Sequence, residues 1–228
     1  MKTDPSDGDV KKKFKSRKNK VFMVEYQGKE RVVKEYREGS HEKLLVERNL
    51  LVGCEKRGIP VPKVMGSTGD TLVLEYIPGP DCKILFEQGH VHILPLMARW
   101  LADFHEAFAH GYRKGDCILG NFLYHDKVIY GIDFEESSQG DPLRDLGDMC
   151  VSILRMGPSF TPERFLQVNS FIGAYFECFS QQPVDLTDPV VEAMDHYSKF
   201  GSDGEELRKW GDRIKEVGSD SIFQNRKG

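Results

Sequence analysis

The feature that most constrains the fold is a change of side-chain pattern at Pro78-Gly79. Before it, residues 21–36 form two runs of β-branched and aromatic side chains around the turn-forming stretch Gln27–Glu30, a pattern typical of a β-hairpin. After it, apolar residues recur at helical spacing for most of the remaining chain. The sequence therefore predicts an α+β fold, with a small β-rich N-terminal lobe joined to a helical C-terminal lobe.

The individual elements follow from the same periodicities. We expect a helix over residues 40–57, with Ser40 as its N-cap, and a buried strand over residues 71–79 that ends at the Pro-Gly turn. The helices expected in the second lobe span residues 92–110, 142–156, 161–180, 188–200 and 203–217. We place the N-terminal lobe at residues 11–79 and the C-terminal lobe at residues 80–228 of a single domain, after a disordered segment over residues 1–10.

Three polar residues stand on the loops of the second lobe. Asp116 and Asn121 lie in KGDCILGN, and Asp133 directly follows the strand-like run VIYGI. One carboxylate that can accept a proton, together with an amide and a carboxylate that can hold Mg²⁺, is the set that phosphoryl transfer needs. An N-cap Asp and a turn Asn are the structural alternative for the first pair.

The stretch GDCILGN followed by IDFE resembles the catalytic loop and metal motif of the protein-kinase-like superfamily. The similarity is to its atypical branch, which contains the aminoglycoside and choline phosphotransferases, the RIO kinases and the small kinase of the tRNA threonylcarbamoyl complex. It covers roughly residues 20–156 and implies the two-lobe kinase-like fold with a nucleotide cleft between the lobes. It also implies that Asp116 is the catalytic carboxylate and that Asn121 and Asp133 are metal ligands.

The same resemblance assigns residues of the first lobe. Val32 and Lys34 share one face of the strand VVKEY, since side chains alternate along a strand. Val32 would lie against adenine and Lys34 would reach the α- and β-phosphates. Glu47, set among apolar residues in LLVERNLL, would pair with Lys34, and Glu42 is the competing candidate nearer the start of that helix.

LVLEYIPG resembles the strand and hinge that join the two lobes of kinases. By this resemblance, Leu74 would back the adenine pocket. Glu75 would offer its backbone carbonyl to adenine, and Ile77 would offer its backbone N–H and carbonyl. Because the backbone does this reading, the side chains do not decide between ATP and GTP.

The sequence departs from the family pattern at several positions. No glycine-rich loop precedes Lys34, and the turn between the first two strands would come from Ser16–Asn19. Lys114 stands where the family usually has His, and Ile118 where many protein kinases have Lys. Glu135 replaces the Gly that follows Asp-Phe in typical protein kinases, as in the small-molecule kinases. Gly115 stands where regulated kinases have Arg, which argues against switching by loop phosphorylation.

Two further residues are interpreted as supports. Asp145 in RDLGDM would brace the catalytic loop by accepting backbone N–H bonds, and His105 would support the core or the loop rather than bind a ligand. A group of acidic residues near the C-terminus could attract a cationic substrate or form a solvated helix face. It consists of Asp185, Asp188, Glu192 and Asp195.

These observations predict an ATP-dependent phosphotransferase that uses Mg²⁺, with Mn²⁺ as an alternative, and moves the γ-phosphate to a hydroxyl of a small molecule or of a protein Ser/Thr. A nucleotide-binding pseudokinase acting as a regulatory scaffold is the alternative. The net charge of −4 argues against a whole-surface nucleic-acid binder and leaves only the basic residues 11–20 for RNA or a partner protein.

The compartment follows from what the sequence lacks. No run approaches the roughly 18 apolar residues of a membrane span, and the first residues contain no apolar signal core. The five cysteines show no CxxC spacing, and we interpret them as free thiols. We therefore expect a cytoplasmic protein with no membrane partner.

Overall fold

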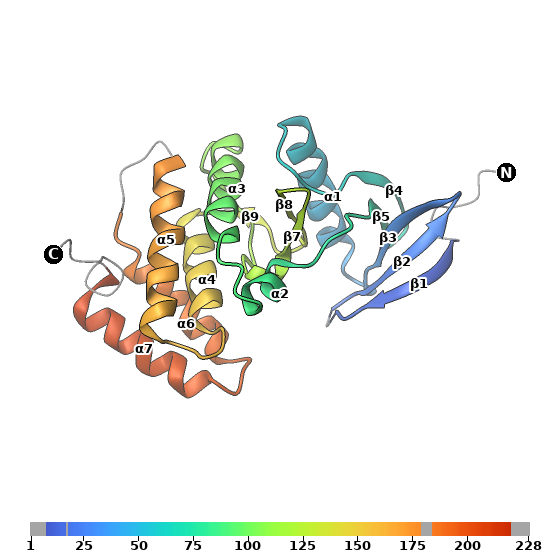
Figure 1. Ribbon diagram of the computed structural model, residues 1–228. Helices are drawn as coiled ribbons and strands as arrows, with labels where there is room; N and C mark the ends of the chain where they lie inside the picture. Colours follow the sequence, from blue (N-terminus) through green and yellow to red (C-terminus); the bar gives the residue numbers. More distant parts are fainter. Residues whose placement is uncertain (1–7, 17, 179–183, 220–228) are drawn as a thin grey trace.

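The computed structural model describes residues 8–16, 18–178 and 184–219. It divides into a sheet-containing lobe and a helical lobe, and the chain passes once from the first to the second (Figure 1). The predicted α+β, two-lobe architecture is therefore confirmed. The disorder predicted for residues 1–10 lies outside the described residues up to residue 7, whereas Asp9 and Val10 belong to a strand.

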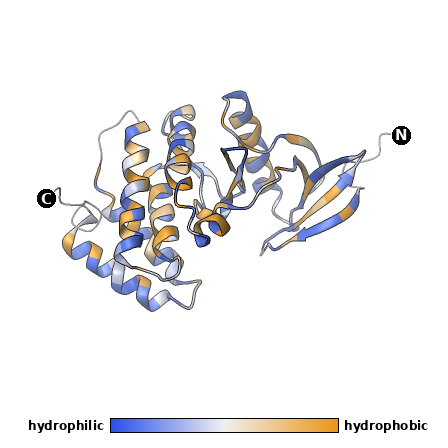
Figure 2. Cartoon of the chain, viewed as in Figure 1, coloured by the Kyte–Doolittle hydropathy of each residue, from blue (hydrophilic) through white to orange (hydrophobic). Residues whose placement is uncertain are grey.

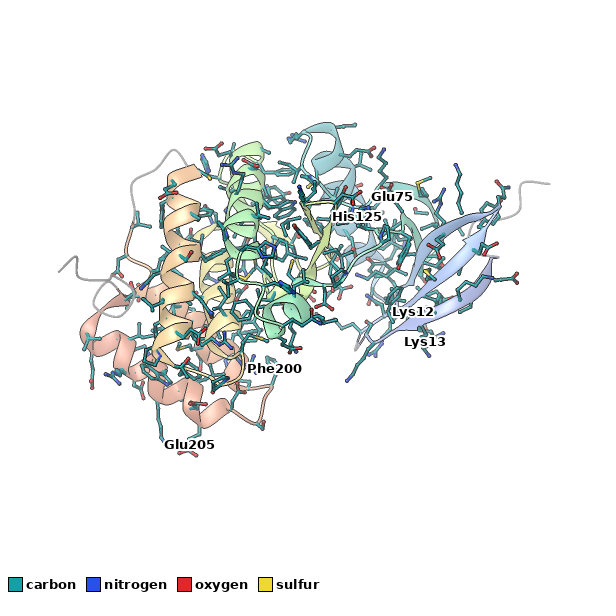
Figure 3. The ribbon with its side chains drawn as sticks, viewed as in Figure 1. Lys12, Lys13, Glu75, His125, Phe200 and Glu205 are labelled. Atoms are coloured by element: carbon teal, nitrogen blue, oxygen red, sulfur yellow. The ribbon has the colours of Figure 1, made fainter. Side chains whose placement is uncertain are left out.

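The N-terminal lobe is one antiparallel sheet with a helix beside it. Its strands run in the spatial order β1-β2-β3-β5-β4. Their bounds are β1 Asp9–Phe14, β2 Lys20–Tyr26, β3 Lys29–Glu35, β4 Val64–Thr68 and β5 Thr71–Glu75, with α1 at His41–Lys56 between β3 and β4. Strand β1 is the part that the periodicity did not predict, because its lysine-rich sequence shows almost no apolar alternation. Lys12 and Lys13 lie on this outermost strand (Figure 3).

The β2–β3 hairpin follows the sequence prediction closely. Its loop is the pair Gln27-Gly28, and both residues have positive φ, of 52° and 70°, as two-residue hairpin loops require. Tyr26 pairs with Lys29 across the loop, so the turn is shorter than the four residues expected. Helix α1 also matches its predicted range, but the Ser40 side chain makes no capping hydrogen bond, which corrects that detail.

The C-terminal lobe packs helices around two short two-stranded sheets, β6–β9 and the hairpin β7–β8. Its helices are α2 Cys82–Glu87, α3 Ile93–Ala107, α4 Leu143–Leu154, α5 Pro162–Cys178, α6 Thr187–Ser198 and α7 Gly204–Val217. Its short strands are β6 Tyr112–Arg113, β7 Phe122–His125, β8 Val128–Gly131 and β9 Ser138–Gln139, with a 3-10 turn at Leu119–Asn121. The five predicted helices are confirmed to within a few residues, while α2 was not predicted.

One hydrophobic core runs through both lobes. It joins Leu72 and Leu74 of the sheet to the buried faces of α1, α3 and α4, and the apolar residues gather on the inward faces of the helices (Figure 2). Trp100 stacks on Phe104 and meets Phe122 edge-on directly beneath the loops of the second lobe. These aromatic contacts therefore pack α3 against the start of the β7–β8 hairpin.

Candidate active site between the lobes

The β7–β8 hairpin brings Asn121 and Asp133 to the same end of a two-stranded ribbon. Phe122 pairs with Gly131, and the Ile132 backbone N–H donates to the Asn121 carbonyl oxygen at 3.0 Å. Asn121 therefore lies across the ribbon from Ile132, the residue before Asp133. Asn121 and Asp133 are thus brought close together although they are twelve positions apart in sequence. Asp133 has a positive φ of 59°, a conformation that is rare outside glycine and asparagine and that turns the chain sharply after the strand.

Asp116 is fixed by Asn121 and approached by a residue from a distant helix. The Asn121 Nδ2 donates to the Asp116 backbone carbonyl at 2.8 Å and to its Oδ2 at 3.1 Å. The Tyr197 hydroxyl of α6 lies 3.5 Å from the other carboxylate oxygen, Oδ1. The loop thus holds Asp116 from one side and leaves Oδ1 with only a long contact.

Asp145 braces the loop that contains Asp116, as the sequence predicted. Its fully buried carboxylate accepts the backbone N–H of Lys114 and, at 2.9 Å, that of Gly115. The imidazole Nε2 of His105 lies 3.1 Å from the same carboxylate, and its Nδ1 lies 2.9 Å from the Tyr175 hydroxyl. The interpretation of His105 as a core support agrees with this arrangement, in which one carboxylate connects two helices to the loop.

Lys114 occupies an unusual position for a lysine. It is fully buried, its Nζ lies 3.5 Å from the Asp133 backbone carbonyl, and it sits 5.2 Å and 5.1 Å from the ring centroids of Phe122 and Phe134. The two aromatic faces and the carbonyl dipole compensate part of the desolvation cost of the ammonium group. The residue therefore contacts the Asp133 backbone from within the core and is not exposed to solvent.

Lys34 lies at the centre of the site. Its Nζ is 2.6 Å from Glu47, 2.7 Å from Asp133 and 3.1 Å from Glu135, and only 8% of its side chain is exposed. The predicted pairing of Lys34 with Glu47 is thus confirmed. Glu42, the competing candidate, is exposed in the first turn of α1.

Tyr36 adds a contact that sequence reasoning missed. It lies two residues beyond Lys34, its hydroxyl donates to the same Glu47 oxygen that Lys34 contacts, and it is 6% exposed. The alternation along β3 could have placed it on the face of Lys34, but no sequence rule identified its partner. Glu47 therefore accepts two hydrogen bonds in a nearly dry environment, which locks its position.

The charges around Lys34 shape the pKa values of the site. Burial lowers the pKa of Lys34, but the carboxylates of Glu47 and Asp133 outweigh it and raise the pKa above its ordinary value. Burial raises the pKa of Glu47 above its ordinary value, and the Asp133 carboxylate adds to this effect, although Lys34 opposes it. Asp133 shows the opposite result: burial alone would raise its pKa, yet Lys34 lowers it below the ordinary value. Lys34 and Asp133 are therefore both charged at neutral pH.

Glu135 and Glu136 connect this centre to the β1–β2 turn. The Asn19 Nδ2 donates to the Glu135 carboxylate, which also contacts Lys34. Glu136 Oε1 forms ion pairs with the Nζ of Lys18 at 2.6 Å and with the Nζ of Lys43 of α1 at 2.5 Å. Sequence reasoning missed these links between the lobes, since their partners are about a hundred residues apart along the chain.

The residues predicted to contact the adenine ring lie on the sheet and at the lobe junction. Val32 pairs directly with Leu74, and Lys34 pairs with Leu72, so Val32, Lys34 and Leu74 share one face of the sheet. Glu75 closes β5, with its backbone N–H bonded to the Lys63 carbonyl at 2.9 Å, and lies at the junction of the two lobes (Figure 3). Ile77 is 6% exposed on the segment that leads to α2.

Asn121 and Asp133 fit a divalent cation. The amide N–H of Asn121 is directed at Asp116, which leaves the amide oxygen as a cation ligand, and only Oδ1 of Asp133 contacts Lys34. Oxygen donors of this kind are those that Mg²⁺ prefers. By contrast, the carboxylates of Glu47, Asp133 and Glu135 have oxygens within 4.8 Å of one another but already surround the Lys34 ammonium group.

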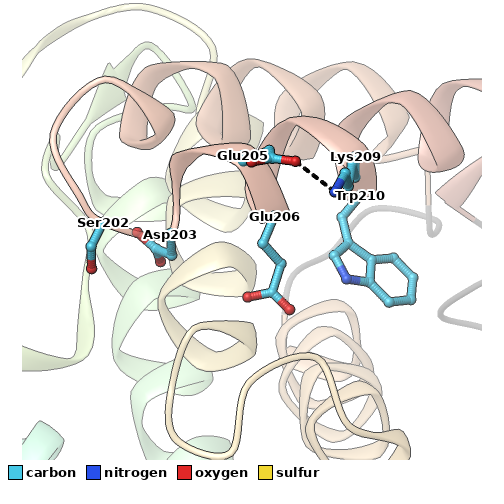
Figure 4. A pocket seen from close by; sticks show the side chains of 6 residues that line it. All are labelled: Ser202, Asp203, Glu205, Glu206, Lys209 and Trp210. Carbon is cyan, nitrogen blue, oxygen red and sulfur yellow. Dashed lines mark ion pairs between the residues drawn. The ribbon is translucent and has the colours of Figure 1, made fainter.

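Two surface hollows lie outside this site. One, of about 510 Å³, is lined by acidic residues and Trp210 at the start of α7 and contains the Glu205–Lys209 ion pair (Figure 4). The other, of about 260 Å³, lies at the β2–β3 turn. The acidic residues Asp185, Asp188, Glu192 and Asp195 are exposed and several have local partners, such as Arg144 for Glu192. They agree with the interpretation as a solvated face.

Comparison with known proteins gives a fold without a sequence family. No protein-family model and no curated protein matches the sequence. An amicoumacin kinase in complex with AMP-PNP, Ca²⁺ and Ami is similar with a TM-score of 0.70 at 11% identity, covering 94% of this chain and 90% of that one. A choline kinase from Cryptosporidium parvum Iowa II gives 0.64 at 13% identity, covering 94% and 91%.

A third structure, an aminoglycoside-3'-phosphotransferase of type VIII, gives a TM-score of 0.60 at 18% identity and covers 73% of this chain and 84% of its own. The chain therefore has the protein-kinase-like fold in the form found in aminoglycoside and choline phosphotransferases. Within the described residues, no helix is both long and apolar enough to cross a membrane.

Proposed function

We propose that this protein is an ATP-dependent phosphotransferase that transfers the γ-phosphate to a hydroxyl group. The observation that carries the proposal is the buried Lys34–Glu47 ion pair, which lies in contact with Asp133 at the junction of the lobes. A purely structural Lys34–Glu47 pair would not need a further carboxylate, Asp133, at a residue with positive φ. A lysine that binds ATP phosphates does need a metal-binding carboxylate beside it. The kinase-like fold supports the same interpretation.

The nucleotide would bind between the sheet and the β7–β8 hairpin. Val32 and Leu74 offer an apolar surface to the adenine ring, and Glu75 and Ile77 offer their backbones to its edge. The N–H and carbonyl of Ile77 have no backbone partner within the part of the chain that the structure describes, so they are available to a purine. Lys34, held by Glu47, would then contact the α- and β-phosphates.

Asn121 and Asp133 would hold Mg²⁺ or Mn²⁺. When bound, the cation neutralises charge on the transferred phosphoryl group. The protein's own contribution is to keep both ligands at one end of the β7–β8 ribbon and to keep Asp133 ionised. The positive charges of Lys34 and Lys114 support that ionised form by lowering its pKa.

Asp116 would orient the acceptor hydroxyl and accept its proton. Oδ2 is held by Asn121, so Oδ1 is the oxygen available to an acceptor. The Tyr197 hydroxyl already lies 3.5 Å from Oδ1, so a hydroxyl group can approach this oxygen. The acceptor is a small hydroxylated molecule or a protein Ser/Thr. The contacts around Asp116 in the described residues do not distinguish the two.

The direct test is release or transfer of the γ-phosphate from labelled ATP with Mg²⁺ or Mn²⁺, in the presence of small hydroxylated acceptors and of protein substrates. We expect Asp116→Asn to lower the rate by about 10²–10⁴-fold, the usual contribution of a positioned base. Asp126→Asn, on the exposed β7–β8 turn, is the control and should leave the rate unchanged.

A nucleotide-binding pseudokinase gives a different result in this experiment. It would bind ATP, and neither the wild type nor Asp116→Asn would transfer phosphate to any acceptor. The replacement of the usual His by the buried Lys114 is the observation that keeps this second function under test. Failure to bind ATP at all would contradict both functions.

A further inference from the structure

We propose that Glu135 is a positioning residue that fastens the β1–β2 turn over the nucleotide site through Asn19. The inference rests on the proposed function, since it concerns the same nucleotide site. Asn19 immediately precedes β2, and Glu135 follows the metal-binding Asp133 by two residues. The Asn19–Glu135 contact therefore links the β1–β2 turn directly to the segment that follows Asp133, beside the ion pairs that Lys34 and Lys18 make with the same segment.

The burial of the participants makes this contact strong. Asn19 is 8% exposed, Glu135 is 6% exposed and Lys34 is 6% exposed. The Asn19 amide donates to Glu135 Oε2, and the same oxygen lies 3.1 Å from the Lys34 ammonium group. A hydrogen bond to a buried charged group is stronger than one at the surface, and losing one partner leaves the other unsatisfied.

The sequence of the turn explains why a side chain is needed. The stretch from residue 14 to residue 20 contains no glycine, so its backbone cannot readily adopt the conformations with which glycines approach a phosphate. Asn19 instead anchors the turn by its amide, and its backbone N–H receives support from the Ser16 hydroxyl at 3.3 Å. The anchored residue sets where β2 begins, and with it the position of Val21 opposite Lys34.

The neighbouring Glu136 provides a matched contrast. It also contacts the turn, through Lys18, but 36% of its side chain and 54% of that of Lys18 are exposed. Exposed ion pairs contribute little in water. Glu135 accepts a buried amide hydrogen bond from Asn19, whereas Glu136 makes an exposed ion pair with Lys18, which also lies 3.7 Å from Glu135. Only the buried Asn19–Glu135 contact should therefore position the nucleotide.

The experiment measures equilibrium binding of a fluorescent ATP analogue with Mg²⁺, which requires no acceptor, for Asn19→Ala, Asn19→Asp and Glu136→Gln. We expect Asn19→Ala to weaken binding about tenfold, the effect of one lost charged hydrogen bond. Asn19→Asp should weaken it further, because a second carboxylate then faces Glu135. Glu136→Gln should stay within about twofold of the wild type.

A double-mutant cycle with Glu135→Ala isolates the pair. If Glu135 acts through Asn19, the Asn19→Ala change will have little further effect on ATP affinity in the Glu135→Ala background. Equal effects of Asn19→Ala in both backgrounds, or an unchanged affinity of Asn19→Ala alone, would overturn the proposal.

Thermal unfolding of the same four proteins without nucleotide separates this inference from the proposed function. Non-additive shifts in Tm support the Asn19–Glu135 link, and additive shifts overturn it. If the wild type binds no ATP, the proposed function fails and the role of the link at the nucleotide fails with it, whatever the Tm cycle reports about the contact.

Discussion

At the scale of single residues, Lys34 is central to the stability of the candidate site. It is the only ammonium group, within the described chain, that contacts Glu47, Asp133 and Glu135 together. Without it, three carboxylates whose oxygens lie within 4.8 Å of one another would repel each other, and two of them, Glu47 and Glu135, are buried. Lys34 is therefore needed to stabilise the folded site, independently of any contact to phosphate.

We therefore expect Lys34→Met to lower the free energy of unfolding by about 3–5 kcal/mol at pH 7, the usual cost of removing one partner from a buried ion pair. The loss should shrink in mild acid, as the stranded carboxyls take up protons. Urea denaturation of the variant at pH 7 and pH 5 measures this. Lys20→Met, which removes an exposed pair with Glu35, is the control and should cost under 1 kcal/mol, about the usual worth of a surface pair.

Asp148 gives the chain a distinct pH response. Burial and the neighbouring Asp145 raise the pKa of this carboxyl from its ordinary 3.8 to about 7. In the unfolded chain it ionises near 3.8, so between that value and 7 the folded state binds more protons. The contribution of Asp148 to stability therefore falls as pH rises through this window.

Replacing the carboxyl by an amide should remove that loss. We expect Asp148→Asn to be more stable than the wild type at pH 8 by about 1–3 kcal/mol, and to show a smaller advantage at pH 5. Urea midpoints measured from pH 4 to pH 8 give the two profiles. Parallel profiles for the two proteins would contradict a raised pKa at Asp148.

The residues of the site differ in how far sequence could identify them. Lys34, Glu47, Asp116, Asn121 and Asp133 could be predicted because their types and order match a known motif, and the Lys34–Glu47 contact proved correct. Asn19, Tyr36 and Tyr197 were not predicted. Their roles come from contacts between segments that only the folded chain brings together, and no local pattern encodes them.

At the scale of elements, α4 connects the loop that contains Asp116 to the rest of the helical lobe. Asp145 in its first turn binds the loop through the Gly115 backbone N–H. Gly147, two residues further along α4, allows α6 to pack closely against it. A Cβ at Gly147 would lie 2.3 Å from the Pro189 carbonyl oxygen. Alanine normally favours a helix over glycine, so the glycine is retained for packing rather than for helix formation.

This contrast predicts opposite effects for two glycine-to-alanine changes. Gly147→Ala should lower the free energy of unfolding by about 1–3 kcal/mol, because the added methyl group overpacks the α4–α6 contact. Gly173→Ala on α5 meets no atom within 4 Å and should raise it by about 0.5–1 kcal/mol. Chemical denaturation of both variants tests the pair. Stabilisation by Gly147→Ala would contradict the close approach of α6.

The helices were predictable because each carries its own apolar periodicity over several turns. The short strands β6 and β9 pair over two residues and carry no such signal. Periodicity alone did not predict strand β1, because its lysines give no alternation. The resemblance did imply a strand before the Ser16–Asn19 turn, and β1 ends at Phe14, at the edge of the sheet where it pairs with β2.

At the scale of the whole molecule, the two lobes share one hydrophobic core and a polar network at their junction. The core extends from the sheet into the helices, and the network joins Lys34, Glu47, Asp133 and Glu135 across the gap in sequence. The similar solved structures agree in topology over most of the chain at 11% to 18% identity. The fold is thus specified by pattern and by a few polar positions, rather than by overall sequence identity.

The most direct test is to follow the consumption of γ-labelled ATP as a function of Mg²⁺ concentration, for the wild type and for Asp133→Asn. We expect saturable, metal-dependent turnover in the wild type. For Asp133→Asn we expect turnover at least about 10²-fold lower, because the proposed charged metal ligand is lost. Turnover at the wild-type rate in Asp133→Asn would contradict the assignment of this site as the centre of phosphoryl transfer.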